Sequence, residues 1–159
     1  MVSTVTYVKG DLLTSDCDYI CHQVNCQGRM GAGIAKQIRN RFPEVYEKYI
    51  NRYEDTVWRG RGTEVMLGSI DVVRLRDSNR YVINMYSQAD YGYDRNRYTS
   101  YDAFAMALEE IKLEVPAGYT IGFPKNIGCG LGGGDWRIIS ILIESILGNE
   151  RDVYIYVLE

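Results

Sequence analysis

The pattern of apolar and polar residues alternates between two periods along the chain. Short runs of apolar or β-branched residues, typical of strands, cover residues 4–8, 19–24, 65–74, 81–85, 119–123 and 152–158. Longer segments with apolar residues at helical spacing cover residues 33–42, 44–53, 101–113 and 136–147. Strands and helices follow each other in turn at both ends of the chain. This order predicts an α/β fold with helices on both faces of a mostly parallel sheet.

Proline, glycine and polar segments separate these elements. Pro43 lacks a backbone N–H and divides the first two helical segments. Gly68 predicts a bend within the strand at 65–74. Residues 55–64 and 87–99 are expected to be loops, and the second is rich in tyrosine and long enough to be functional.

The composition is that of an ordinary globular protein. With 159 residues, 46% of them apolar and 25% charged, the chain predicts a single domain over residues 1–159. Its net charge of −3 provides no basic field to hold nucleic acid. No apolar run is long enough to span a membrane and the first residues do not resemble a signal peptide, so we expect a cytoplasmic protein.

The four cysteines and the one histidine form no metal-ligand pattern, so neither a metal nor a cofactor is expected. Cys17, Cys21 and Cys26 are expected to be free thiols. Cys129 lies within a glycine-rich loop, where it could act as a nucleophile. The prediction is instead that its side chain turns into the core while its amide faces a ligand.

Two glycine-rich loops carry the candidate chemistry. Residues 28–33 follow the apolar run 19–24, residues 128–134 follow the run 119–123, and each loop opens a helix. Glycine leaves backbone amides uncovered, and amides at a helix N-terminus attract anions. Ligands in such sheets bind beyond the carboxyl ends of the strands. The pair of loops therefore predicts a site that grips a diphosphate from two sides.

Residues 128–133 also satisfy the dinucleotide pattern G-x-G-x-x-G. We do not interpret them as a Rossmann fingerprint, because that pattern opens a βαβ unit with an acidic residue ~20 positions later. Here the chain after the loop has room for one helix and one strand only.

Three motifs, in their order and spacing, resemble the macrodomain family of ADP-ribose-binding modules. They lie at residues 8–13 (VKGDLL), 22–35 (HQVNCQGRMGAGIA) and 127–136 (IGCGLGGGDW). The resemblance implies a three-layer α/β/α fold with a central mixed, mostly parallel sheet of about six strands. It is strongest to the compact subgroup that includes ADP-ribose-1″-phosphate phosphatases and enzymes that remove ADP-ribose from glutamate or DNA bases.

The resemblance also implies roles for individual residues. Asp11 would accept the adenine amino group, with the Leu12 amide nearby, Asn25 would reach the distal ribose, and Tyr156 would lie near the adenine face. Contacts to the phosphates, and from the second loop also to the distal ribose, would come from Gly31, Ala32, Gly33, Ile34, Gly128, Cys129, Gly130, Leu131 and Gly132. From the residues alone, Asp11 and Asn25 could be turn residues, and Tyr156 could be a core strand tyrosine.

Three side chains are candidates for moving or orienting a proton. The reference pKa of histidine, near 6.5, would suit His22 for acid-base work, and phosphatases of the family carry a histidine at the matching place, but it could equally be a histidine buried in the sheet. Asp135 precedes a helix, so capping is its first expected role and catalysis its second. Asp90 lies in the tyrosine-rich loop, which could bring it to the distal phosphate.

Two departures from the family pattern narrow the chemistry. Gly132 stands where the glutamate-directed hydrolases of the family carry an aspartate. No lysine lies between Lys48 and Lys112. We therefore do not expect the covalent route of the base- and glutamate-directed enzymes, which passes through a lysine adduct. We therefore expect hydrolysis of ADP-ribose-1″-phosphate to ADP-ribose and phosphate. The alternatives are removal of ADP-ribose from a modified protein or nucleic acid, a non-catalytic ADP-ribose reader, and a general nucleotide-binding module.

Overall fold

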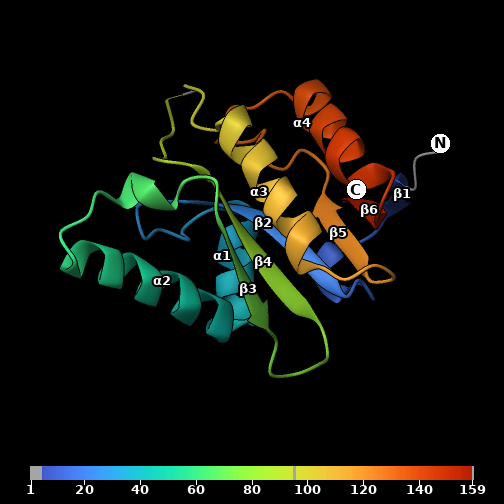
Figure 1. The fold of residues 1–159 in the computed structure, drawn as a ribbon, viewed down its shortest axis with the longest axis horizontal. Coiled ribbons are helices and arrows are strands. Elements are labelled where there is room, and N and C mark those ends of the chain that lie inside the picture. The colour runs from blue at the N-terminus through green and yellow to red at the C-terminus, as the bar shows by residue number, and fades with distance from the viewer. Residues whose placement is uncertain (1–4, 95, 159) are drawn as a thin grey trace.

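A computed structural model describes residues 5–94 and 96–158, which form one sheet covered by helices (Figure 1). The strands are β1 (Val5–Lys9), β2 (Tyr19–Asn25), β3 (Ile70–Arg74), β4 (Tyr81–Gln88), β5 (Thr120–Pro124) and β6 (Asp152–Val157). The α-helices are α1 (Gly33–Arg41), α2 (Pro43–Trp58), α3 (Tyr101–Glu114) and α4 (Trp136–Ile143). Shorter helical segments are η1 (Leu12–Thr14), η2 (Thr63–Met66) and η3 (Glu144–Gly148).

The sheet confirms the predicted mixed, mostly parallel arrangement. Its strand order is β1-β6-β5-β2-β4-β3. Every neighbouring pair is parallel except β3 and β4. Helices α1 and α2 cover one face and α3 and α4 the other, as Figure 1 shows. Because five strands run the same way, their carboxyl ends meet at one edge of the sheet.

Alternate residues of the central strands enter two separate cores. On β2, Tyr19 and Cys21 pack with α3 and α4, whereas Ile20 and Val24 pack with α1 and α2. This follows from the two-residue period of a strand, whose successive side chains point to opposite faces. A central strand therefore has to be apolar on both faces, which explains the nearly unbroken apolar run in the sequence.

Several predicted boundaries differ from the structure. The segment 65–74 is a strand only from Ile70, because its first residues form the turn η2, in which the Leu67 amide donates to the Glu64 carbonyl at 3.0 Å. Residues 55–58, predicted as a loop, continue α2, and β4 extends to Gln88. Thr4, the predicted start of the first strand, lies outside the described residues.

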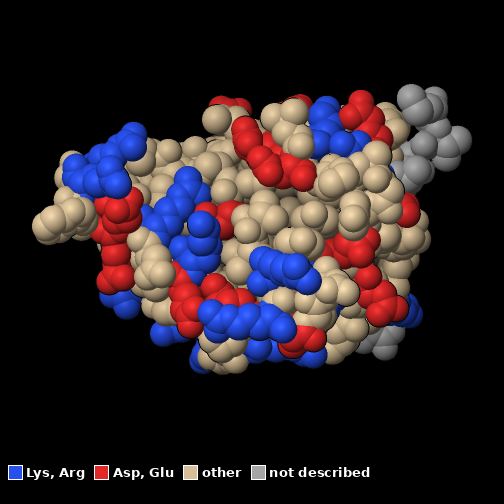
Figure 2. All heavy atoms as spheres, turned by 60° about the horizontal axis from the view of Figure 1, so that its bottom comes forward, with Lys and Arg blue, Asp and Glu red and all other residues tan. Residues whose placement is uncertain are grey.

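The surface mixes charges of both signs. Figure 2 shows basic side chains interleaved with acidic ones over the face in view. Ion pairs such as Arg59–Asp55 at 2.9 Å are exposed, and pairs of this kind contribute little stability. Among the helices of the described ranges, none has both the length and the apolar character needed to cross a bilayer.

A buried polar network links the centre of the sheet to α2. The Asp71 carboxylate, 4% exposed, accepts hydrogen bonds from Arg52 at 2.9 Å, Tyr86 at 2.6 Å and Asn84 at 3.1 Å. Asn84 Oδ1 lies 2.6 Å from Nε2 of the fully buried His22. Since the Asn84 amide nitrogen donates to Asp71, its oxygen must accept, which places the His22 proton on Nε2.

Burial sets the charge state of His22. Removal from water disfavours the imidazolium and lowers the pKa of His22 to about 4, against the smaller opposing effects of Asn84 and Asp71. Its Nδ1 is a buried nitrogen that has no hydrogen-bond partner within the described residues. His22 is therefore a neutral member of the network at physiological pH.

Removing the centre of this network should destabilise the fold. Asp71→Ala removes the carboxylate partner of the Arg52 guanidinium and the acceptor of the Tyr86 hydroxyl and the Asn84 amide, so we expect a loss of about 3 kcal/mol or more. Chemical denaturation measures the loss. The matched control is Asp55→Ala, which removes the exposed partner of Arg59 and should change stability by less than about 0.5 kcal/mol. Equal losses in the two variants would contradict the buried network.

His22 should make the protein less stable in mild acid. Its folded pKa lies below the usual value of 6.5, so the unfolded chain binds a proton more readily. Stability is therefore retained above pH 6.5 and lost as the pH falls toward about 4, by up to about 3 kcal/mol. In His22→Gln this part of the pH dependence should be absent. Denaturation of both proteins across this range tests the expectation, and parallel curves would refute it.

Candidate functional site

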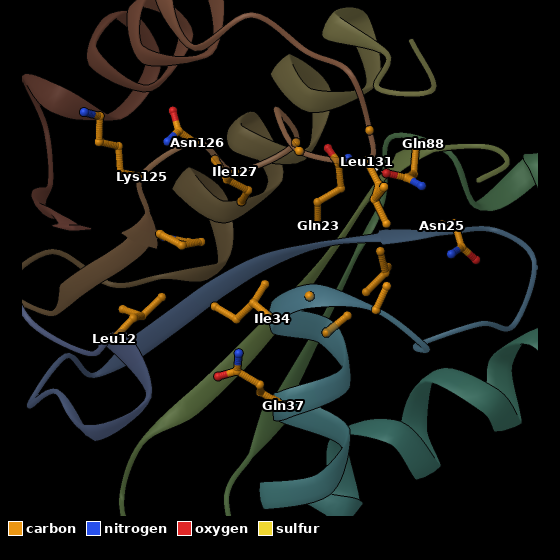
Figure 3. A pocket seen from close by; sticks show the side chains of 18 of the residues that line it. Leu12, Gln23, Asn25, Ile34, Gln37, Gln88, Lys125, Asn126, Ile127 and Leu131 are labelled. Atoms are coloured by element: carbon orange, nitrogen blue, oxygen red, sulfur yellow. Dashed lines mark hydrogen bonds between the residues drawn. The ribbon is translucent and has the colours of Figure 1, made fainter. Parts of the chain in front are cut away.

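A cavity of about 810 Å³ opens at the edge of the sheet where the parallel strands end. This volume is in the range of small-molecule sites. Each of the five parallel strands contributes residues at its carboxyl end, namely Gly10, Asp11 and Leu12 after β1, Gln23 to Asn25 on β2, Gln88 on β4, Pro124 to Ile127 at the end of β5, and Tyr156 to Leu158 at the end of β6. Figure 3 shows side chains from these ends and from both glycine-rich loops around the same space.

The first loop presents uncovered amides at the start of α1. Gly31, Ala32, Gly33 and Ile34, the residues predicted to contact a phosphate, all line the cavity. Ala32 caps the helix without a side-chain hydrogen bond. Within the described residues, no acceptor meets the amides of Gly33, Ile34 and Ala35, which lie in the first turn. This helix end is therefore suited to an anionic group.

The second loop lies across the cavity from the first. The Gly133 and Gly134 amides donate to the Gly130 and Gly128 carbonyls at 3.0 and 2.8 Å. The amides of Gly130, Leu131 and Gly132 meet no acceptor in the part of the chain that the structure describes. These three residues and Gly128 line the cavity.

Cys129 differs from its neighbours in this loop. Its amide donates to the Asn126 carbonyl at 2.8 Å and is not among those left uncovered, which departs from the sequence expectation. Its side chain packs against the core under α3 and α4, in line with the expected core position. Burial raises the pKa of the Cys129 thiol to about 11, so the thiolate needed for nucleophilic attack is disfavoured.

One end of the cavity is formed by the predicted adenine-binding residues. Asp11 Oδ1 accepts from the Leu13 amide at 2.9 Å, which caps η1 and leaves the second carboxylate oxygen available. Tyr156 is half-buried on β6, and its hydroxyl lies 3.9 Å from Cys17 Sγ. Asp11, Leu12 and Tyr156 all line the cavity, and Lys125 lies on this side in Figure 3.

Asn25 lies at the other end, and its side chain is largely occupied. Its oxygen accepts from the Gln27 amide at 2.9 Å and the Tyr49 hydroxyl at 2.8 Å, and its nitrogen donates to the Arg29 carbonyl at 2.9 Å. These bonds shape the start of the first loop. One amide hydrogen of Asn25 is left for the predicted contact with a ribose.

The structure brings none of the three predicted catalytic side chains to the cavity. His22 is fully buried in the network with Asn84. Asp90 is exposed, and its carboxylate accepts from the Tyr91 amide at 2.8 Å. Asp135 caps α4 by accepting from the Arg137 amide at 2.9 Å, and the Arg137 side chain lowers the pKa of Asp135.

Several polar and aromatic residues of the cavity were not expected from the sequence. They include Gln23, Arg29, Gln37, Gln88, Tyr91 and Tyr93. Tyr91 and Tyr93 come from the loop that was expected to be functional, although no residue in it other than Asp90 was singled out. Gln23 and Gln88 could have been found from their positions at strand carboxyl ends, a signal that needs the strand ends to be known.

The chain is similar in sequence to known proteins that share one domain family. The Macro domain model matches residues 21–141. A DNA ADP-ribosyl glycohydrolase of Mycobacterium tuberculosis is 30% identical over 149 residues, which cover 94% of this chain and 40% of that protein. An ADP-ribose 1''-phosphate phosphatase of Meyerozyma guilliermondii is 27% identical over 107 residues, which cover 60% of this chain and 59% of that protein.

A solved structure agrees with these sequence relatives. The macrodomain of Mycobacterium tuberculosis DarG has a TM-score of 0.74 and 28% identity to this chain, with 96% of each chain covered. The present chain thus corresponds to less than half of the glycohydrolase it resembles and to the whole of that separate macrodomain. From the family model, the sequence relatives and the shared fold together, the chain belongs to the macrodomain family.

Proposed function

We propose that this protein binds ADP-ribose in the cavity and hydrolyses an ADP-ribose derivative. One observation carries the proposal: two loops with uncovered backbone amides face the same cavity from opposite sides. A diphosphate has anionic oxygens on both of its phosphates, so it can use both loops at once. A single phosphate could use only one of them.

The side chains at the two ends give the ligand a direction. Adenine lies at the end with Asp11 and Tyr156, because a free carboxylate oxygen can accept from its amino group and the tyrosine can cover its face. The distal ribose then lies between the second loop and the end with Asn25 and Gln88. The tyrosine-rich loop borders this end through Tyr91 and Tyr93, which are exposed.

We further propose that the substrate is ADP-ribose-1″-phosphate, whose phosphoryl group is transferred to water while the 1″ oxygen of ADP-ribose leaves. The lysine that lines the cavity within the described residues is Lys125, at the proposed adenine end, so a lysine adduct with the distal ribose has no support. Attack by water on a bound phosphate needs positioning and charge stabilisation, which amides of the second loop can supply. A relative named as a phosphatase of this ester is consistent with the proposal.

A second candidate is a reader that binds ADP-ribose without turnover. It is favoured by the absence of His22, Asp90 and Asp135 from the residues that line the cavity. Calorimetry with ADP-ribose, AMP and NAD, followed by phosphate release from ADP-ribose-1″-phosphate, separates the two candidates. An ADP-ribosylated oligonucleotide and protein test the other leaving groups. Tight binding without turnover of any of these substrates would support the non-catalytic reader. Equal affinity for ADP-ribose, AMP and NAD would reject both candidates.

Gly33→Glu should abolish ADP-ribose binding. Gly33 has a φ of +57° and lines the cavity, so glutamate adds both backbone strain and a carboxylate beside the bound phosphate. We expect affinity to fall at least about a hundredfold, measured by calorimetry. The matched control is Gly118→Glu, at another positive φ of +95° with open space around its Cβ and outside the cavity. If the control loses as much affinity, the effect is strain alone.

Asp11→Ser should weaken binding of adenine-containing ligands while it preserves the turn. Serine is a good cap and can still accept from the Leu13 amide, but it removes the free carboxylate oxygen. Loss of a charge-assisted hydrogen bond should cost about 1.5–3 kcal/mol of binding free energy. Titration of the variant with ADP-ribose and AMP measures this. Unchanged affinity for both ligands would show that Asp11 does not contact the adenine.

A further inference from the structure

The Thr99 side chain and backbone hold the second loop at two points. Thr99 Oγ1 lies 2.7 Å from the Gly128 carbonyl, which also accepts from the Gly134 amide. The Thr99 backbone amide donates to the Gly132 carbonyl at 2.9 Å. Thr99 is 2% exposed and comes from the end of the tyrosine-rich loop, far from these glycines in the sequence.

Gln23 fixes the direction of the Thr99 hydroxyl. The amide nitrogen of Gln23 donates to Thr99 Oγ1 at 2.9 Å and to Gln88 Oε1 at 2.6 Å. Gln88 Nε2 donates to the Asp90 carbonyl at 2.8 Å, so Gln88 Oε1 must accept from the Gln23 nitrogen, and this establishes which end of Gln23 faces Thr99. The Gln23 oxygen then accepts from the Ser87 hydroxyl at 2.6 Å. An amide nitrogen can only donate, so the single hydroxyl hydrogen of Thr99 must go to the Gly128 carbonyl.

These bonds reduce the conformational freedom that a glycine-rich loop would otherwise lose when it binds a ligand. Glycine has many accessible conformations, so a loop of glycines would lose much entropy on closing around an anion. Holding the carbonyls of Gly128 and Gly132 against Thr99 restricts the loop before a ligand arrives. The packing is close: a Cβ added at Gly132 would lie 2.5 Å from Thr99 Oγ1 and 2.8 Å from the Gly128 carbonyl oxygen.

We propose that Thr99 is a positioning residue that preorganises the second loop for the ligand phosphate, and that Gln23 acts through it. The proposal rests on the function proposed above, because the phosphate is taken to be that of ADP-ribose. Thr99 also forms an isolated antiparallel β-bridge with Gln88, and the Ser100 amide donates to the Ser87 carbonyl at 2.8 Å. These bonds close the base of the tyrosine-rich loop, so that loop and the second glycine-rich loop share one anchor.

Thr99→Val tests the proposal, because valine keeps the shape of threonine and removes the hydroxyl. We expect ADP-ribose affinity to fall roughly tenfold by calorimetry, the effect of about one hydrogen bond. Thr99→Ser should restore most of it. The matched control is Thr56→Val, which removes a buried hydroxyl that donates to the Arg52 carbonyl on α2, away from the cavity. It should leave affinity unchanged.

Hydrogen exchange supplies a readout that does not depend on the ligand. In ligand-free Thr99→Val the Gly134 amide, which donates to the Gly128 carbonyl, should exchange faster than in the parent, while the core strands are unchanged. Parent-like affinity and exchange in Thr99→Val would overturn the proposal, as would an equal loss of affinity in Thr56→Val. If the parent does not bind ADP-ribose, the proposed function fails. The exchange data then still decide whether Thr99 orders the loop.

Gln23→Leu tests whether Gln23 acts through Thr99. The single variant should lose ADP-ribose affinity to a similar extent as Thr99→Val. The double variant should lose little more than either single one, since both changes break the same chain of hydrogen bonds. Additive losses would show that Gln23 acts on its own and would overturn this part of the proposal.

Discussion

The site depends on keeping a few backbone amides unpaired beside one cavity. An amide that is buried without a partner is costly, so a chain can leave amides uncovered only where water or a ligand can reach them. In this protein the amides are those at the start of α1 and at Gly130 to Gly132. The neighbouring carbonyls bond elsewhere, within the helix in the first case and to Thr99 in the second. Such an arrangement suits an anionic ligand.

The parallel sheet brings the two sets of amides together. Both loops follow strands of the same direction, so both emerge at the same edge. Strands β2 and β5 are direct neighbours in the sheet order, which places the loops on opposite sides of a narrow space. The antiparallel strand β3 lies at the far edge and contributes no residue to the cavity lining within the described chain.

The polar residues of the sheet divide into two groups with different roles. His22, Asn84 and Asp71 lie under α1 and α2 and connect to Arg52, so they act on the stability of the fold. Gln23, Ser87 and Thr99 lie on the opposite side and connect to the second loop. His22 and Gln23 are adjacent in the sequence, and the alternation of a strand sends them to opposite faces. The strand therefore directs the histidine into the buried network and its amide neighbour toward the second loop.

The sequence by itself determined the fold class, the two loops and 12 of the 28 residues that line the cavity. Those features depend on local patterns: strand and helix periods, glycine runs before helices, and motifs of the family. Only the tertiary structure decided the surroundings of His22 and Gln23, because their hydrogen-bond partners come from distant segments. His22 meets Asn84 across 62 positions, and Gln23 meets Thr99 across 76. No local pattern can specify such partners, since they are chosen by the pairing of strands.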